Sequence, residues 1–321
     1  MGRAERTGIG EIGKRREIRA GALTAAVTIL IPTYNRVRAL EAVWPSYLVH
    51  PDVARIIVID DGSSDGTSER VRELANDSPI PVDVIRHDAQ RGQPASRMSG
   101  IAAATTEWVL FGEDDVWLSR DYCSTLLREA LELDASIIAG RIVTARVPRE
   151  FDESSLVDPP SPLRDASEVF DLTSMDAKFS ERVRSPVPAP YIHSIALIRR
   201  DTFTKVKFDT WYSGNSWREE TDFYLAANAA GAKAYFTGST VCYHLRGPIS
   251  AVGGQRVNRL RFEYLVWRNT RYLMNKHWPY LKRAHGLRGT PMGWTIRYYL
   301  RRQADQLKRI AQSGFRSTYS G

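Results

Sequence analysis

Between residues 25 and 111 the chain alternates short apolar runs with helix-like stretches, and this pattern constrains the fold more than any other feature. The runs are rich in β-branched residues and cover 27–31, 54–60, 82–86 and 108–111, with helical patterns at 36–49, from 67, and at 93–104. Short apolar strands separated by helices predict a parallel sheet covered on both faces. We therefore expect an α/β fold with a mostly parallel central sheet flanked by helices.

The rest of the chain is less regular. Strand patterns occur near 136–145, 191–198, 234–236 and 240–244, and helical patterns at 219–230, 256–276 and 295–312. Residues 146–190 contain seven prolines, which predicts a variable loop or insertion. We expect one main domain over 25–250, a basic N-terminal extension over 1–24, and a helical C-terminal extension over 251–321.

Charge is unevenly distributed over these parts. The whole chain carries a net charge of +8, yet residues 251–321 hold fifteen basic and two acidic side chains, and residues 1–20 hold six basic and three acidic ones. The body between them is therefore acidic. An acidic body suits the binding of a cation or a sugar, whereas a basic extension suits an anionic partner.

The sequence also bears on location. The two cysteines, Cys123 and Cys242, exclude a disulfide scaffold and fit a reducing compartment. The longest apolar runs fall well short of the ~20 residues that a membrane-spanning helix needs. The basic start is not followed by an apolar segment and a small-residue cleavage site, so we expect no signal peptide and a cytoplasmic protein.

Acidic and polar residues follow the predicted strands. In a parallel sheet, ligands bind beyond the carboxyl ends of the strands, which brings together 32–35, 60–66, 86–92 and 113–115. The three carboxylates of Glu113-Asp114-Asp115 repel one another, and a hard divalent cation would relieve that repulsion; a solvated acidic turn is the alternative. The turn at 60–66 suits either a local structural role or a ribose or base contact.

Two common nucleotide-binding motifs are missing. No G-x-G-x-x-G follows the first strand, and no G-x-x-x-x-G-K-[ST] occurs in the sequence. A dinucleotide-binding protein and a P-loop nucleotidase are therefore disfavoured.

Three segments at consecutive strand ends together resemble family 2 glycosyltransferases. They are Ile31-Pro32-Thr33-Tyr34-Asn35-Arg36, Ile59-Asp60-Asp61-Gly62-Ser63-Ser64-Asp65-Gly66-Thr67 and Phe111-Gly112-Glu113-Asp114-Asp115. The resemblance covers roughly residues 25–245. It implies the nucleotide-sugar-binding A-type glycosyltransferase fold, an inverting mechanism, and a divalent cation, Mn²⁺ or Mg²⁺.

The resemblance also implies roles for individual residues. The nucleotide-sugar would be bound by Pro32, Thr33, Tyr34, Asn35, Asp60, Asp61, Arg97, Glu113 and Asp114, with Arg97 facing the diphosphate. Which of the two aspartates of the second segment takes the base stays open. Asp115 would ligate the metal, and His244, at the end of a predicted strand, would complete the metal site. For His244 a structural hydrogen bond is the alternative.

A second acidic segment, 219–222, begins a predicted helix. An inverting transfer needs one base to remove the proton of the acceptor hydroxyl. By the same resemblance Glu220 occupies the position of that catalytic carboxylate, with Glu219 and Asp222 as competitors. Acidic residues in a first turn also simply favour a helix N-terminus.

The basic C-terminal extension interleaves aromatic and arginine residues. Docking on an anionic membrane surface, packing against the core with a basic outer face, and nucleic-acid binding all fit this composition. We favour the membrane and do not expect nucleic acid to be the partner. A homodimer formed through the aromatic residues stays open.

These observations lead to one expected function and two alternatives. We expect a metal-dependent inverting glycosyltransferase that moves a single sugar from a nucleotide-diphosphate sugar to a hydroxyl acceptor, which can be lipid-linked, in cell-surface polysaccharide, glycolipid or glycan assembly. It would bind peripherally to the cytoplasmic face of the cell membrane. Processive relatives carry membrane-spanning helices and a Gln-x-x-Arg-Trp motif, neither of which is found here. The alternatives are a non-catalytic carbohydrate or lipid-surface binding protein and a sugar-phosphate nucleotidyltransferase.

Overall fold

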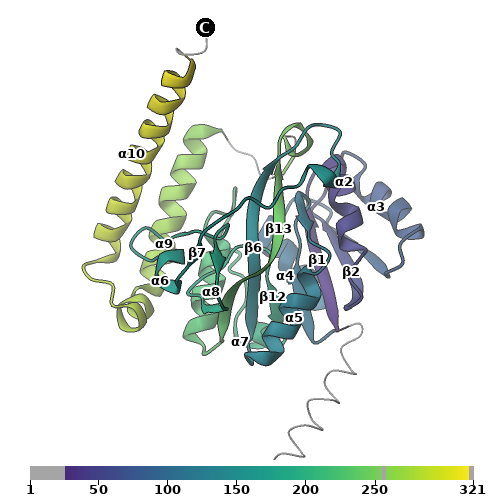
Figure 1. Cartoon of the computed structure of the whole chain (residues 1–321), viewed down its shortest axis with the longest axis horizontal. Coiled ribbons are helices and arrows are strands. Elements are labelled where there is room, and N and C mark those ends of the chain that lie inside the picture. Colours follow the sequence, from purple (N-terminus) through teal and green to yellow (C-terminus); the bar gives the residue numbers. More distant parts are fainter. Residues whose placement is uncertain (1–25, 252, 255–257, 318–321) are drawn as a thin grey trace, which may run out of the picture.

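A central sheet with helices on both faces forms the body of the molecule (Figure 1). The computed structural model describes residues 26–251, 253–254 and 258–317, so the N-terminal extension expected over 1–24 lies outside the described residues. Within these ranges nine strands form the main sheet, in the order β11-β13-β6-β12-β4-β1-β2-β3, with β5 paired to β13. These strands are β1 (Val27–Thr33), β2 (Val53–Asp60), β3 (Val82–Arg86), β4 (Trp108–Phe111), β5 (Val116–Leu118), β6 (Ile137–Arg146), β11 (Val187–Pro188), β12 (Leu197–Arg199) and β13 (Ala234–Arg246).

Most of the sheet is parallel, as the sequence predicts. Strand β1 pairs in parallel with β2 and β4, β2 with β3, and β6 with β13. Strand β12 runs antiparallel between β4 and β6. The carboxyl ends of the parallel strands therefore share one edge of the sheet, which lies at the top of Figure 1.

The two faces of the sheet bury alternate residues. In β1, Ile29 and Ile31 belong to one hydrophobic cluster and Leu30 to the other, and all three are fully buried. The first cluster is covered by α2 (Val37–Tyr47), α3 (Thr67–Asn76) and α5 (Tyr122–Glu132); the second involves α8 (Glu219–Ala229), α9 (Arg259–His285) and α10 (Pro291–Ser317), with α4 (Gln93–Ala103). Burial on both faces explains why the strands are continuously apolar.

The second half of the chain differs from the predicted boundaries. The two strand patterns at 234–236 and 240–244 form one long strand, β13, with an irregular register between Phe236 and Val241. The strand pattern at 191–198 forms only the short β12. The helical patterns of the extension continue further than expected, to His285 in α9 and to Ser317 in α10.

The proline-rich insertion is folded onto the body. It contains β7 (Leu163–Arg164), α6 (Ala166–Val169), β8 (Phe170–Asp171), β9 (Asp176–Ala177), β10 (Arg182–Val183) and a 3₁₀ turn, Glu153–Ser155. The buried guanidinium of Arg141 in β6 donates hydrogen bonds of 2.8 and 2.7 Å to the two carboxylate oxygens of Asp158. Such a bidentate pair fixes both position and orientation of the segment that bears the carboxylate.

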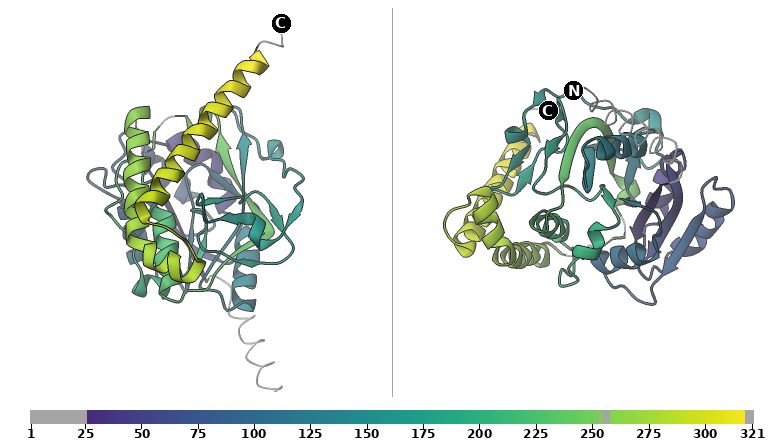
Figure 2. Two further views of the ribbon diagram at one scale, coloured as in Figure 1. Left: turned by 90° about the vertical axis from the view of Figure 1, so that its left-hand side faces the viewer. Right: turned by 90° about the horizontal axis from the view of Figure 1, so that it is seen from below.

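Helices α9 and α10 form an antiparallel hairpin along one side of the molecule (Figure 2). The buried face of the hairpin belongs to the same hydrophobic cluster as the sheet, through Val266, Leu273, Met274, Trp278, Leu281, Trp294 and Tyr298. The C-terminal extension thus packs on the core through one of its faces. Within the described ranges, none of the helices combines the length and the hydropathy that crossing a bilayer requires.

Candidate active site

The loops that follow β1 and β2 are tied together by Asn35. This residue adopts a left-handed conformation with φ of 53°, which asparagine tolerates better than most residues. Its backbone N–H donates a 2.8 Å hydrogen bond to Ser63 Oγ, and its side-chain oxygen accepts one of 2.7 Å from the backbone N–H of Ser64. Asn35 therefore builds the rim between the two loops instead of lining the cavity described below.

The two aspartates of the second segment have different roles. Asp60 is fully buried, accepts hydrogen bonds from the backbone N–H of Ser63 (2.8 Å) and from Ser68 Oγ, and pairs with Arg86. Asp60 is not part of the cavity lining, so the structure does not bring it to the site at which we expected it to bind the nucleotide-sugar. Asp61 is the aspartate that borders the cavity.

Asp61 joins the β2 end to the loop before α4. Its oxygens accept hydrogen bonds from the backbone N–H groups of Arg91 (2.9 Å) and Gly92 (2.8 Å). The ring nitrogen Nδ1 of His87 lies 2.8 Å from Asp61 Oδ1. The carboxylate is thus held rigidly at the cavity wall.

A tyrosine clamps the acidic turn at the end of β4. Tyr47 Oη donates a 2.8 Å hydrogen bond to the carbonyl of Glu113 and accepts one of 3.1 Å from its backbone N–H. The preceding residue must be glycine, because a Cβ on Gly112 would lie 2.8 Å from Tyr47 Oη. In the Phe-Gly-Glu-Asp-Asp segment, the glycine thus lets α2 pack closely against the turn that carries the three acidic residues.

Strand pairing brings His244 to the acidic turn. In the antiparallel pair of β13 and β5, His244 lies opposite Val116, and the backbone N–H of Leu245 donates a 2.8 Å hydrogen bond to the carbonyl of Asp115. As a result His244 Nε2 is 3.3 Å from Asp115 Oδ2. The structure thus unites two residues that are far apart in sequence and that we expected to share a metal.

Arg36 balances the charge of this turn. One of its terminal nitrogens lies 2.7 Å from Asp114 Oδ1 and 2.8 Å from Asp115 Oδ2. Burial would raise the pKa of Asp115, but His244 and Arg36 outweigh it and hold the pKa at about 2. For Asp114 burial dominates, and together with the neighbouring Asp115 it raises the pKa to about 6 despite Arg36. Asp115 is therefore ionised at neutral pH, as a metal ligand must be.

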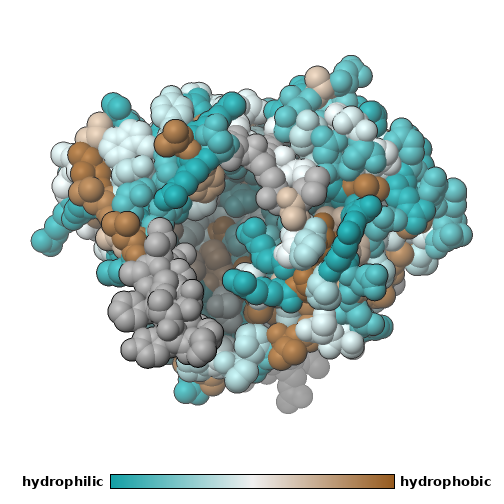
Figure 3. All heavy atoms as spheres, turned by 90° about the horizontal axis from the view of Figure 1, so that it is seen from above, coloured by the Kyte–Doolittle hydropathy of each residue, from teal (hydrophilic) through white to brown (hydrophobic). Residues whose placement is uncertain are grey.

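These groups surround one cavity of about 270 Å³ at the carboxyl ends of the strands. Its lining comprises Pro32, Thr33, Tyr34, Arg36, Asp61, Gln93, Ser96, Glu113, Asp114, Asp115, His244, Arg246 and Gly254. Seen from above, the surface is hollowed at its centre on this edge of the sheet (Figure 3). The cavity thus gathers all three segments that carry the resemblance.

Arg97 does not line that cavity. It is almost fully buried, and its terminal nitrogens lie 2.7 Å from Glu219 Oε1 and 3.0 Å from Glu220 Oε1. A longer contact of 3.6 Å reaches Glu113 Oε1. Phe111 and Phe208 cover the guanidinium, each with its ring centroid 5.2 Å away. Arg97 therefore faces the acids of α8 instead of an exposed diphosphate site.

Three glutamates share this single guanidinium. Burial raises the pKa of Glu219 to about 8, and its neighbours Glu220 and Glu113 add to the rise. Burial likewise raises the pKa of Glu113 to about 7, with Glu220 and Asp115 contributing. The side chain of Glu220 is 32% exposed, whereas that of Glu219 is 2% exposed. Glu113, whose side chain is 21% exposed, lines the cavity, so Glu220 is the exposed member of the group that remains for a second substrate.

Asp222 is bound on all sides by the C-terminal hairpin and its neighbours. Its carboxylate lies 2.8 Å from Lys276 Nζ, 2.8 Å from His277 Nε2 and 3.2 Å from Tyr212 Oη. It is almost completely buried. The expectation that Asp222 competes as base is therefore at odds with its position, because its oxygens already anchor α9 to α8.

The loop before α8 has an unusual backbone and is clamped by the hairpin. Gly214, Ser216 and Arg218 all have positive φ values, and such residues persist only where the surroundings hold them. The buried Asn269 of α9 donates a 3.0 Å hydrogen bond to the carbonyl of Trp217. The guanidinium of Arg218 lies 4.9 Å from the ring centroid of Tyr298 in α10. The hairpin thus supports the segment that presents Glu220.

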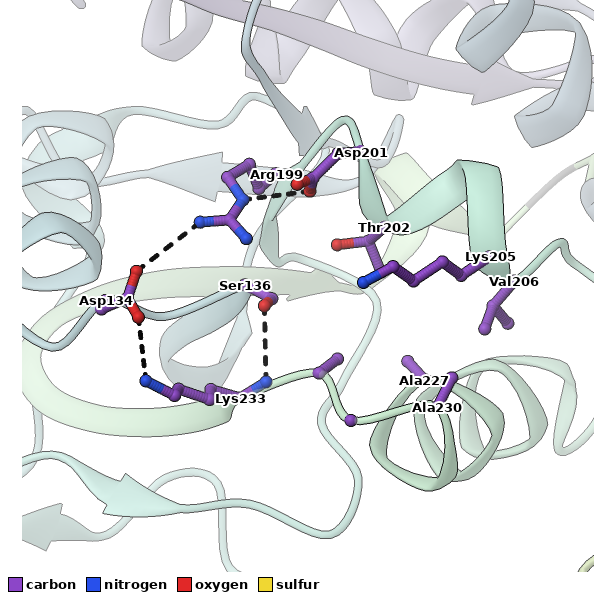
Figure 4. A pocket seen from close by; sticks show the side chains of 12 residues that line it. Asp134, Ser136, Arg199, Asp201, Thr202, Lys205, Val206, Ala227, Ala230 and Lys233 are labelled. Atoms are coloured by element: carbon purple, nitrogen blue, oxygen red, sulfur yellow. Dashed lines mark hydrogen bonds and ion pairs between the residues drawn. The ribbon is translucent and has the colours of Figure 1, made fainter.

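A second, smaller cavity of about 130 Å³ lies at the opposite edge of the sheet (Figure 4). It borders the amino ends of β6 and β13, and none of the residues predicted to act in the site lines it. Its charges are largely paired: Asp134 lies 2.8 Å from Lys233 Nζ and 3.7 Å from Arg199, which also contacts Asp201 at 3.0 Å. We therefore assign no chemistry to it.

Comparison with known proteins identifies the family. The family model described as glycosyl transferase family 2 matches residues 28–206, which is more than half of the chain. The chain belongs to glycosyl transferase family 2. The sequence resemblance is thereby confirmed.

Family 2 relatives match over part of their length. The putative glycosyltransferase EpsH of Bacillus subtilis is 33% identical over 109 residues, which is 33% of this chain and 31% of EpsH. The GalNAc(5)-diNAcBac-PP-undecaprenol beta-1,3-glucosyltransferase of Campylobacter jejuni is 28% identical over 134 residues, covering 40% of this chain and 43% of that protein. The chain spans less than half the length of either relative.

Solved structures support the A-type fold of this glycosyltransferase family. S. aureus TarS in complex with UDP-GlcNAc superimposes with a TM-score of 0.53 at 16% identity, over 77% of this chain and 65% of that one. GalNAc-T7 with UDP, GalNAc and Mn²⁺ gives a TM-score of 0.51 at 17% identity, over 70% of this chain and 44% of that one. At these identities the likeness concerns the fold, and it confirms the expected α/β architecture with a C-terminal helical part.

The structure brings together two of the donor atoms that a divalent cation could use, and Arg36 lies 2.8 Å from one of them, Asp115 Oδ2. In the part of the chain that the structure describes, no three or more His, Cys, Asp or Glu side chains converge on one point. Asp115 and His244 do lie together, and an ionised carboxylate with an imidazole supplies part of the coordination shell of Mn²⁺ or Mg²⁺. Mg²⁺ commonly binds one or two carboxylates and completes its shell with substrate phosphates and water.

The sequence left several contributors to this family 2 site without a role. Arg36 is the last residue of the Pro-Thr-Tyr-Asn-Arg segment. Its place at a strand end that was expected to adjoin the acidic turn could have indicated its pairing with Asp114 and Asp115. Tyr47 lies among apolar residues of α2, where nothing marks it as a clamp. Lys276 and His277 belong to a generally basic stretch, and their pairing with α8 depends on tertiary contacts.

Proposed function

We propose that this member of family 2 is a metal-dependent inverting glycosyltransferase that transfers one sugar from a nucleotide-diphosphate sugar to a hydroxyl acceptor. The observation that carries the proposal is the cavity that combines the three family segments with His244, with Glu220 linked to Glu113 through Arg97. A donor site thereby adjoins a reachable carboxylate.

The donor half of the proposal rests on the first-half loops. Pro32, Thr33, Tyr34 and Asp61 line the cavity and would bind the nucleoside, with Asp114 near the ribose. Asp115 and His244 would hold a divalent cation, which would supply positive charge to the departing diphosphate. TarS was solved with UDP and with UDP-GlcNAc, and GalNAc-T7 with UDP, so UDP-linked sugars are the first donors to test.

The transfer step needs a base, and we assign Glu220 to it. The acceptor oxygen attacks the anomeric carbon while Glu220 takes the hydroxyl proton. The bond between that carbon and the diphosphate oxygen breaks, and its electron pair leaves with the nucleoside diphosphate. Attack from the face opposite the leaving group inverts the anomeric configuration.

Arg97 is a positioning residue in this scheme. Its ion pair of 3.0 Å with Glu220 orients the carboxylate, and its pair with the buried Glu219 ties that orientation to the core of α8. Because Arg97 is enclosed by two aromatic rings, its guanidinium can move little. A general base must be held within hydrogen-bonding distance of the proton that it removes.

The name of one relative bears on the acceptor and on the cellular setting of the reaction. The relative from Campylobacter jejuni is named for an acceptor on a polyprenyl diphosphate, which supports a lipid-linked acceptor for this chain as well. We propose that its reaction belongs to cell-surface polysaccharide, glycolipid or glycan assembly and takes place at the cytoplasmic face of the membrane.

A thermal-shift panel tests the donor site. UDP-, GDP- and dTDP-linked sugars are added with and without Mn²⁺, since a ligand that binds only the folded state raises the melting temperature. One nucleotide class should give a rise that depends on the cation, and Asp115→Asn should abolish that dependence. No rise with any donor in a well-folded sample would favour a non-catalytic binding protein.

A further inference from the structure

The outward face of the α9–α10 hairpin carries most of the exposed large apolar side chains of the described chain. Six of the nine lie there: Leu260 (85% exposed), Tyr264 (61%), Met292 (37%), Ile296 (43%), Leu300 (63%) and Leu307 (67%). Apolar side chains also gather at the left margin of Figure 3, the side on which the hairpin lies. Exposed apolar side chains concentrated in this way mark an interaction surface.

The spacing of these residues places them in one row along each helix. In α10, Met292, Ile296 and Leu300 are four residues apart, and Leu307 follows two turns later, so all four point to one side of the helix. In α9, Leu260 and Tyr264 are also four apart. The ring contact of 5.5 Å between Trp267 of α9 and Tyr299 of α10 joins the two helices beside the stripe. We call these six residues the hairpin stripe.

Positive charge borders the hairpin stripe. Residues 258–308 contain twelve Lys and Arg but two acidic residues, Glu263 and Asp305. Glu263 is taken up between the helices, where it contacts Arg302 at 3.2 Å and Gln303 at 2.9 Å. The arginines at 297 and 301 and the lysine at 308 are exposed and follow the apolar residues by one position each. An apolar face edged by basic side chains is the pattern of a helix that lies in the membrane interface.

The hairpin is fixed in place by its other face. Trp294 and Tyr298 of α10 are buried in the core cluster, and Lys276 and His277 of α9 hold the buried Asp222. The hairpin stripe therefore cannot fold back onto the body. In Figures 1 and 2, α10 rises past the body on the edge where the carboxyl ends of the strands lie.

We propose that the hairpin stripe and its basic border dock the protein on an anionic lipid surface. Charge complementarity selects this occupant: two copies of the chain would bring two strongly positive faces together, whereas phosphate headgroups neutralise them. Only the purpose of docking rests on the proposed function: docking would bring a lipid-linked acceptor to the edge of the sheet where the candidate active site lies. A face that binds lipid also explains why leucines remain exposed on a helix that is anchored elsewhere.

Vesicle flotation tests the proposal on the full chain. Vesicles of phosphatidylcholine alone and vesicles with added phosphatidylglycerol are compared at low and physiological salt. We expect flotation with the anionic vesicles, weaker binding at higher salt, and about tenfold less bound protein for the pair Ile296→Ser and Leu300→Ser. The pair Arg297→Gln and Lys308→Gln should lose the preference for anionic lipid.

A matched control uses exposed apolar residues on another face. The pair Val157→Ser and Leu163→Ser, with parent side chains 69% and 52% exposed, should float like the parent protein. Cation-dependent nucleotide binding is measured on every variant, so failure of the donor site and failure of docking are separate results. Docking is overturned if the parent stays soluble with anionic vesicles, or if the hairpin pair floats as well as the parent. It is also overturned if that pair converts a stable dimer into a monomer without changing flotation.

Discussion

The molecule contains two runs of three carboxylates, Glu113-Asp114-Asp115 after β4 and Glu219, Glu220 and Asp222 at the start of α8. The runs look alike in sequence but meet different counter-charges in the fold. In the first run, Arg36 and His244 keep Asp115 ionised beside a cavity. In the second run, Arg97 and the α9 pair of Lys276 and His277 leave Glu220 as the reachable acid.

This difference shows that partners distant in sequence decide what a local acidic cluster does. Asp115 and His244 are 129 positions apart, and Arg97 and Glu220 are 123 apart. Each acidic run also contains a glutamate with a raised pKa, the partly exposed Glu113 at about 7 and the buried Glu219 at about 8. Arg97 touches both glutamates, so the two runs form one electrostatic unit.

The largest expected effect comes from the second run. Glu220→Gln removes the base that we propose and should lower turnover by about a thousandfold, in the range typical of general-base removal. Turnover is measured as release of the nucleoside diphosphate in the presence of a lipid extract that contains the acceptor. Binding of the nucleotide should stay within about twofold of the parent, because Glu220 does not line the donor cavity. Full turnover in the variant would mean that another residue is the base.

The next effect concerns stability and the anchoring role of Asp222. Asp222→Ala leaves His277 without its buried partner and Lys276 with Asp209 alone, and should cost roughly 3 kcal/mol of unfolding free energy. Asp201→Ala is the matched control, because Asp201 pairs with Arg199 at 3.0 Å on the surface and should cost less than about 0.5 kcal/mol. Urea unfolding measures both. Equal costs would mean that the contacts of Asp222 do not hold the hairpin on α8.

The smallest effect is a pH slope that arises from Glu219. Its pKa is about 8 in the folded protein against the ordinary 4.5, so between these values the folded chain holds a proton that the unfolded chain has lost. Stability from this group therefore falls as pH rises from about 5 to 8. Glu219→Gln stays neutral, and its melting temperature should fall by roughly 3 °C less than that of the parent over this range.

The control for this slope is the set of charges that face Glu219. Arg97, Glu113, Glu220 and Asp222 all act on its carboxyl group, and all remain in the variant. If the melting temperatures of parent and variant change equally with pH, the proton that the folded chain retains is bound by another carboxyl group of this set.

The sequence predicted the parts that local patterns encode. Continuous apolar runs such as that in β1 identify buried parallel strands, and topology then places their polar ends at one edge. That reasoning led to the cavity and to most of its lining, from Pro32 to Asp115. The short β5 and its pairing with β13, which brings His244 to Asp115, have no comparable local signal.

Other predictions depended on where the fold places residues of the same chemical type. Asp60 and Asp61 are adjacent and chemically identical, and protein groups hydrogen-bond to both, but only Asp61 borders the cavity. Arg97 suits an anionic ligand by type, yet burial between Phe111 and Phe208 turns it toward protein carboxylates. Such choices come from tertiary packing, which a pattern of residue types does not contain.

Our central claim is that the first acidic run binds the cation and the nucleotide, whereas the second supplies the base. Calorimetric titration of the nucleoside diphosphate, beginning with UDP, with and without Mn²⁺, tests this claim most directly. It uses the parent, Asp115→Asn and Glu220→Gln. We predict cation-dependent binding in the parent, the same binding within about twofold in Glu220→Gln, and at least tenfold weaker binding without cation dependence in Asp115→Asn. Unchanged cation-dependent binding in Asp115→Asn, or its loss in Glu220→Gln, would contradict the account.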